Sequence, residues 1–154
     1  MGARKSLNLL DLAESAVLRG ITPSYGGSLA EAASVCLEDQ GHGPVVLLEV
    51  VGAFDAEFEL VRQGVTDEIR MSHNDLVRAA EDGACAVAVL LVRELTGWSA
   101  FCQAARSGRR STRGLERGTN NKSGFDYWVG SVDDGLFQDK ARLEVSGILR
   151  GTGS

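Results

Sequence analysis

The stretches FDYWVG (residues 125–130) and KARLEVSG (residues 140–147) predict two neighbouring β-strands near the end of this 154-residue chain. Side chains alternate between the faces of a strand, so the second stretch is polar on one face and apolar on the other. The first stretch is largely aromatic but contains Asp126. Charged side chains rarely enter such strands without a partner, so this carboxylate points to binding or chemistry.

A second carboxylate, Glu144, lies on the following predicted strand, and Asp133-Asp134-Gly135 predicts a hairpin turn between the two. Two carboxylates on adjacent strands, with Lys140 close by, are suited to hold Mg²⁺ or Mn²⁺ through oxygen ligands and to orient a phosphodiester for attack by water. The alternative is that Glu144 forms a surface ion pair with Lys140 or Arg142, worth only ~0–1 kcal/mol. Both interpretations stay open.

This order, an aspartate in one strand and a glutamate with a lysine nearby in the next, after a long helix, resembles the PD-(D/E)XK nuclease superfamily. In that superfamily the lysine follows the glutamate by two positions, a place held here by Ser146, and the nearest lysine on the same strand face is Lys140. The segments CLEDQGH (36–42), RELTG (93–97) and ARLEVSGI (141–148) also resemble a family of uncharacterised bacterial proteins. That family continues past the last strand, so the resemblance covers most of this chain but not the whole family domain.

The resemblance implies a restriction-endonuclease-like core, truncated here after the last strand. It also implies a site in which Asp126 and Glu144 hold Mg²⁺ or Mn²⁺, Glu81 from the preceding helix adds an outer ligand or orients water, and Lys140 steadies the attacking water. The implied activity is that of a magnesium-dependent endonuclease acting on DNA in bacterial defence.

Residues 106–122 carry six basic side chains and one acidic one, a net charge of +5 in a chain whose total is −5. The basic residues are Arg106, Arg109, Arg110, Arg113, Arg117 and Lys122. Positive charge concentrated in a loop rich in glycine and serine, here residues 106–124, suits binding to a nucleic-acid phosphate backbone without reading bases. The alternative is a solvated insertion with no ligand.

Composition and length indicate the number of domains and the class of protein. At 154 residues the chain is sized for one domain, with a helical part over 1–43 and a sheet-and-helix core over 44–154. The longest apolar run, Ala84 to Val92, is nine residues, too short to span a membrane, and the start of the chain shows no signal-peptide pattern, so we expect a cytoplasmic protein. Three widely spaced cysteines are expected to be core residues.

Local patterns predict a mixture of helices and strands. Helices are expected over Leu7–Arg19, over Leu29–Leu37 with Ser28 as N-cap, and from Thr66 to Thr96, divided at Asp82-Gly83 and closed by Gly97. Residues 44–51 and 54–61 predict a β-hairpin, and residues 98–105 a further strand. The expected class is α/β (α+β), with a mixed, largely antiparallel sheet flanked by helices.

Two functions follow from these patterns. The first is the metal-dependent nuclease described above. The second is a non-catalytic binding or assembly subunit that retains the fold and engages a partner protein or nucleic acid. A free sheet edge after the last strand would also favour a homo-oligomer or a subunit of a larger complex.

Overall fold

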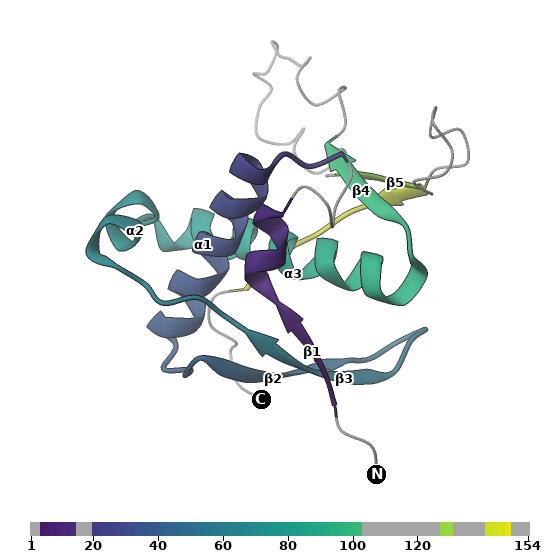
Figure 1. The fold of residues 1–154 in the computed structure, drawn as a ribbon, viewed down its shortest axis with the longest axis horizontal. Helices are drawn as coiled ribbons and strands as arrows, with labels where there is room; N and C mark the ends of the chain where they lie inside the picture. The colour runs from purple at the N-terminus through teal and green to yellow at the C-terminus, as the bar shows by residue number, and fades with distance from the viewer. Residues whose placement is uncertain (1–3, 15–19, 103–126, 131–140, 149–154) are drawn as a thin grey trace.

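The computed structural model describes residues 4–14, 20–102, 127–130 and 141–148. Its elements, drawn in Figure 1, follow one another as β1 (Lys5–Asn8), a 3-10 helix η1 (Leu9–Ala13), α1 (Pro23–Asp39), β2 (Val45–Val50), β3 (Ala56–Val61), α2 (Asp67–Ser72), α3 (Leu76–Thr96), β4 (Ser99–Cys102), β5 (Tyr127–Gly130) and β6 (Ala141–Leu143). The predicted α+β class is confirmed. No helix within the described ranges is long and apolar enough to cross a membrane.

The described strands form two three-stranded sheets. Sheet A has the order β1-β3-β2, in which β2 is antiparallel and β1 parallel to β3. Sheet B has the order β4-β5-β6 and is antiparallel throughout. Figure 1 shows the two sheets on opposite sides of the helices α1 and α3.

One hydrophobic core joins both sheets to the helices. Phe58 and Leu60 enter it from sheet A, Val89 from α3, and Tyr127 and Val129 from sheet B. Burial of such apolar area stabilises the fold by roughly 25 cal/mol per Å². Sheet B is therefore held on the body of the protein by its own inward-facing residues, which fixes the strands that flank the predicted site.

The two long helices begin and end where the sequence supplies capping groups. The Thr22 side chain accepts a hydrogen bond from the backbone N–H of Tyr25 at 3.2 Å, and Pro23 opens α1, a position where its missing N–H costs nothing. The Asp75 carboxylate caps α3 in the same way, and Gly97 closes it with φ +78°, a left-handed conformation that favours glycine. The predicted closure at Gly97 is confirmed.

The predicted helix over Leu7–Arg19 is wrong in its described part. Leu7 pairs with Leu60 in the parallel ladder of β1 and β3, and the 3-10 helix η1 follows directly. The Asn8 side chain caps η1 by accepting from the N–H of Leu10 at 2.9 Å. The segment 1–43 therefore contributes a strand as well as helices, because the pairing with β3 outweighs the local leucine spacing.

Two further helix boundaries differ from the predictions. Helix α1 begins at Pro23, so Ser28 lies inside it, and Gly26 serves close packing: a Cβ there would lie 1.8 Å from the carbonyl oxygen of Leu12. The predicted stretch from Thr66 does begin at a Thr66 cap, but it divides at residues 73–75, where Asp75 starts a new helix. Gly83 lies in the unbroken interior of α3.

Candidate functional site

Sheet B brings three chain segments together at one end. Cys102, the last residue of β4, pairs with Tyr127, the first residue of β5, and Tyr127 in turn pairs with Leu143, the last residue of β6. Asp126 is the residue before Tyr127 in the sequence, and Glu144 is the residue after Leu143. The prediction that the two strands are neighbours is therefore confirmed.

The same row of paired residues fixes where the basic segment attaches. Residues 103–126 connect Cys102 to Tyr127 in the sequence, and those two residues are direct neighbours across the ladder. Both ends of the segment that carries the arginines thus join the sheet beside the point where Glu144 follows Leu143. We refer to this row, Cys102–Tyr127–Leu143, as the acidic end of sheet B.

Tyr127 anchors the acidic end to the helical body. Its side chain is buried, with 2% exposure, and its hydroxyl lies 2.9 Å from the hydroxyl of Tyr25 in the first turn of α1. Burial, and then the hydrogen bond to Tyr25, raise the pKa of Tyr127 far above its usual value, so the phenol stays neutral. The neutral hydroxyl of Tyr127 thus ties β5 to α1 through its hydrogen bond with Tyr25.

Glu144 and Glu81 are both described, and both side chains are exposed. Gly147, three residues after Glu144, packs so closely on α3 that a Cβ there would lie 2.4 Å from the carbonyl oxygen of Ala80. This contact places Gly147 beside Ala80, the residue that precedes Glu81 in α3.

The other predicted site residues lie outside the described residues. They are Asp126, Lys140 and the basic set Arg106, Arg109, Arg110, Arg113, Arg117 and Lys122. Within the described ranges no group of three or more His, Cys, Asp or Glu side chains is arranged to hold a metal ion. Glu81 and Glu144 supply the hard oxygen donors that Mg²⁺ prefers, but a metal site needs further ligands beyond these two.

Sequence reasoning missed an apolar groove of about 290 Å³ between α1 and α3. Its lining includes Cys36, Gln40, His42, Ala84, Val87 and Ile148. Burial, and then the carboxylates of Asp39 and Asp82, raise the pKa of the Cys36 thiol. The thiol therefore remains protonated, which is opposite to the activation that a cysteine nucleophile requires. The sequence feature that indicates a close approach of α1 and α3 is the row of small residues on α3.

Comparisons of the chain with protein-family models, with curated proteins and with solved structures found no significant match.

Proposed function

We propose that the chain is a nuclease-like protein that binds the phosphate backbone of nucleic acid at the acidic end of sheet B. The observation that carries this proposal is the paired row Cys102–Tyr127–Leu143. It joins both ends of the arginine-rich segment to the strand ends next to Asp126 and Glu144. Cationic side chains beside carboxylates are what a protein needs to hold a phosphodiester close to a divalent cation.

The proposed metal is Mg²⁺ or Mn²⁺, with Asp126 and Glu144 as ligands and with Glu81 and Lys140 nearby. When bound, such an ion would polarise the phosphodiester and lower the pKa of a bound water. The exposure of Glu81 and Glu144 supports the proposal in one respect, since an approaching backbone must reach these carboxylates. We place the protein in the cytoplasm, where such a substrate is available.

Metal binding is tested by calorimetry on the full chain with Mn²⁺ and Mg²⁺. We expect a site that is lost in Asp126→Asn and in Glu144→Gln but kept in Glu59→Gln, a matched change on sheet A. Cleavage assays on DNA would then follow with the same variants. A folded wild-type protein that binds neither ion rules out the nuclease activity for this chain.

Phosphate binding is tested separately by fluorescence anisotropy of a labelled DNA duplex over a range of salt concentrations. If Arg109 and Arg110 each contact one phosphate, replacing either residue with glutamine reduces the magnitude of the slope of log affinity against log salt by about 0.9. Arg4→Gln removes the same charge near sheet A, where Arg4 pairs with Glu57 at 3.0 Å, and should leave the slope unchanged. Equal effects of the three substitutions would show that binding does not depend on the proposed segment.

The second candidate is a non-catalytic binding or assembly subunit with the same fold. It requires the basic residues of segment 106–122 but no metal ligands. It predicts salt-dependent duplex binding without any metal site, so the two experiments together separate it from the nuclease.

A further inference from the structure

The free edge of sheet A is strand β2, with the sequence VVLLEV over residues 45–50. β2 pairs only with β3 among the described strands, and no described strand lies on its other side. Natural proteins usually protect such an edge with lysine, proline, a bulge or a covering element, because its unpaired backbone groups recruit other strands. Within β2 only Glu49 is charged.

The hydrogen-bond pattern shows which backbone groups face that edge. Arg62 donates its backbone N–H to the carbonyl oxygen of Pro44 at 2.9 Å, so these two residues form a hydrogen-bonded pair. Such pairs alternate along an antiparallel ladder, which directs the N–H and C=O groups of Val46, Leu48 and Val50 toward β3. The corresponding groups of Val45, Leu47 and Glu49 therefore point away from β3, toward the free edge.

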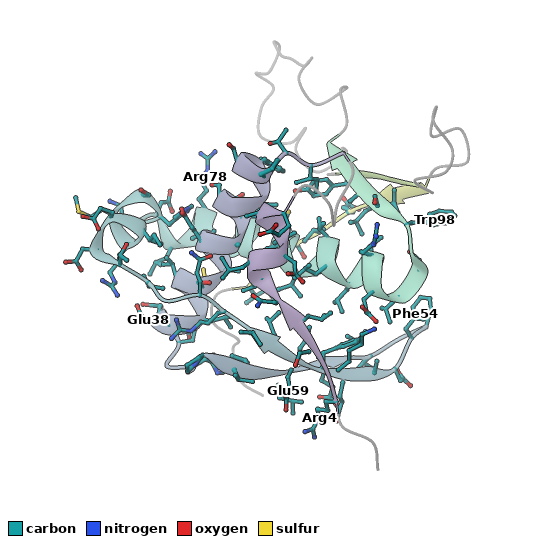
Figure 2. The ribbon with its side chains drawn as sticks, viewed as in Figure 1. Arg4, Glu38, Phe54, Glu59, Arg78 and Trp98 are labelled. Atoms are coloured by element: carbon teal, nitrogen blue, oxygen red, sulfur yellow. The ribbon has the colours of Figure 1, made fainter. Side chains whose placement is uncertain are left out.

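The side chains of these same three residues lie on the outer face of sheet A. Val45 and Leu47 are 55% and 54% exposed, whereas Leu48 and Val50 pack against the core on the opposite face. The outer face of the adjacent strand β3 carries Glu57 and Glu59. In Figure 2 Glu59 and Arg4 lie on the side of sheet A that points away from the helices. An apolar row on the edge thus runs beside an acidic row on the central strand.

We propose that β2 pairs with β2 of a second copy of this chain, antiparallel about a two-fold axis at Leu47, so that two copies of sheet A form one continuous sheet. A two-fold axis normal to the sheet keeps each residue on its own face, so only registers that pair residues of the same face are allowed. With the axis at Leu47, the edge-directed residues meet one another. Leu47 lies opposite the partner's Leu47, and Val45 lies opposite the partner's Glu49. Each of these pairs exchanges both of its backbone hydrogen bonds.

Charge and polarity favour a second copy as the occupant over an unrelated strand. In this register Leu47 meets the partner's Leu47, which reduces the exposed area of both leucines. Glu49 avoids the partner's Glu49, whereas like charges directly opposite each other destabilise a strand pair. The strand is thus complementary to itself in the register that pairs all three of its edge-directed residues within β2.

The first test is sedimentation equilibrium of the full chain. We expect a dimer of twice the chain mass of 16.3 kDa for the wild type and a monomer for Leu47→Lys. Glu59→Lys makes a comparable change on the same face of the central strand and should remain a dimer. Leu47→Pro removes an N–H that only the partner uses, so it should also give a folded monomer, checked by circular dichroism. A monomeric wild type, or a dimeric Leu47→Lys, overturns the proposal.

The second test fixes the register without disturbing the fold. Two Leu47→Cys chains place their Cα atoms ~5.5 Å apart, within the range for a disulfide of about 4.4–6.8 Å. Val45→Cys is the matched control, because Val45 has the same face and nearly the same exposure. The two Val45 positions are offset along the strands by about 13 Å, four residues at ~3.3 Å each. On non-reducing gels Leu47→Cys should form a linked dimer and Val45→Cys should not; equal linking, or none in Leu47→Cys, rejects this register.

Discussion

Gly83 lies on α3 where this helix crosses α1, and the contact leaves no room for a side chain. A Cβ at this position would lie 2.9 Å from the Cα of Ala33. Alanine in a helix interior usually gains about 1 kcal/mol over glycine, but overpacking a rigid contact costs about 1–3 kcal/mol. We expect Gly83→Ala to lower the free energy of unfolding by about 1 kcal/mol, since the atom it meets is backbone.

Urea unfolding of Gly83→Ala measures this effect, with Gly64→Ala as the control. No heavy atom lies within 4 Å of a Cβ built on Gly64, so that variant should stay within about 0.5 kcal/mol of the wild type. A Gly83→Ala protein more stable than the wild type would mean that the helices separate without cost.

Cys36 provides a second prediction at the residue scale. Burial and the Asp39 and Asp82 carboxylates raise the pKa of its thiol, and only the thiolate reacts with alkylating reagents. The pH midpoint of Cys36 alkylation should therefore lie higher in the folded chain than in urea, and Asp39→Asn should lower it. Because the folded pKa is above the unfolded one, the thiol's contribution to stability is complete below the unfolded pKa and is lost as pH rises toward the folded pKa. Peptide mapping by mass spectrometry distinguishes alkylation of Cys36 from alkylation of the other cysteines. An equal pH midpoint in the folded chain and in urea would contradict a raised pKa of Cys36.

At the scale of elements, the hydrogen bond between Tyr25 and Tyr127 joins α1 to β5. The hydroxyls are 2.9 Å apart, and Tyr127 is buried. We expect Tyr127→Phe to lower the free energy of unfolding by about 1–2 kcal/mol, because it removes a buried bonded hydroxyl. In a double-mutant cycle with Tyr25→Phe the coupling should be ~0.5–1.5 kcal/mol. Fully additive effects would show that the two hydroxyls do not interact.

The elements that sequence reasoning predicted are those whose signals are local. The β2–β3 hairpin and the closure of α3 at Gly97 follow from apolar runs and turn residues in immediate succession. Strand β1 was missed because its partner lies far along the chain: Lys5 pairs with Phe58. The start of α1 was missed because Gly26 reads locally as a turn, whereas it is needed for the close approach of Leu12.

In the candidate site, too, features with local sequence signals could be predicted, and features that depend on distant parts of the chain could not. The adjacency of the strands next to Asp126 and Glu144 was predictable, since the two strands follow each other in sequence and pair as Tyr127 with Leu143. The contact of Gly147 with Ala80, which brings the Glu144 segment to α3, depends on tertiary packing. The free edge at β2 was equally hidden, because it exists only if β1 occupies the other side of β3.

At the scale of the whole molecule, the free edge of sheet A and the acidic end of sheet B lie on opposite sides of α1 and α3 (Figure 1). A dimer through β2 would therefore leave both acidic ends accessible, and under the proposed function the assembly would carry two phosphate-binding sites. Two linked sites on one duplex raise the overall affinity through effective concentration, without any new contact. We expect the wild type to bind a duplex long enough to span both sites at least ~10-fold more tightly than a short one.

Leu47→Pro adds no charge, so it separates this avidity from binding at a single site. It should bind the short duplex as the wild type does and should lose the preference for the long one, because a monomer has only one acidic end. Anisotropy titrations with both duplexes at one salt concentration measure the ratio. If the Leu47→Pro monomer keeps the preference for the long duplex, the preference arises from the duplex itself, since longer DNA offers more places for a single site to bind. The two sites of the wild-type dimer would then bind DNA independently of each other.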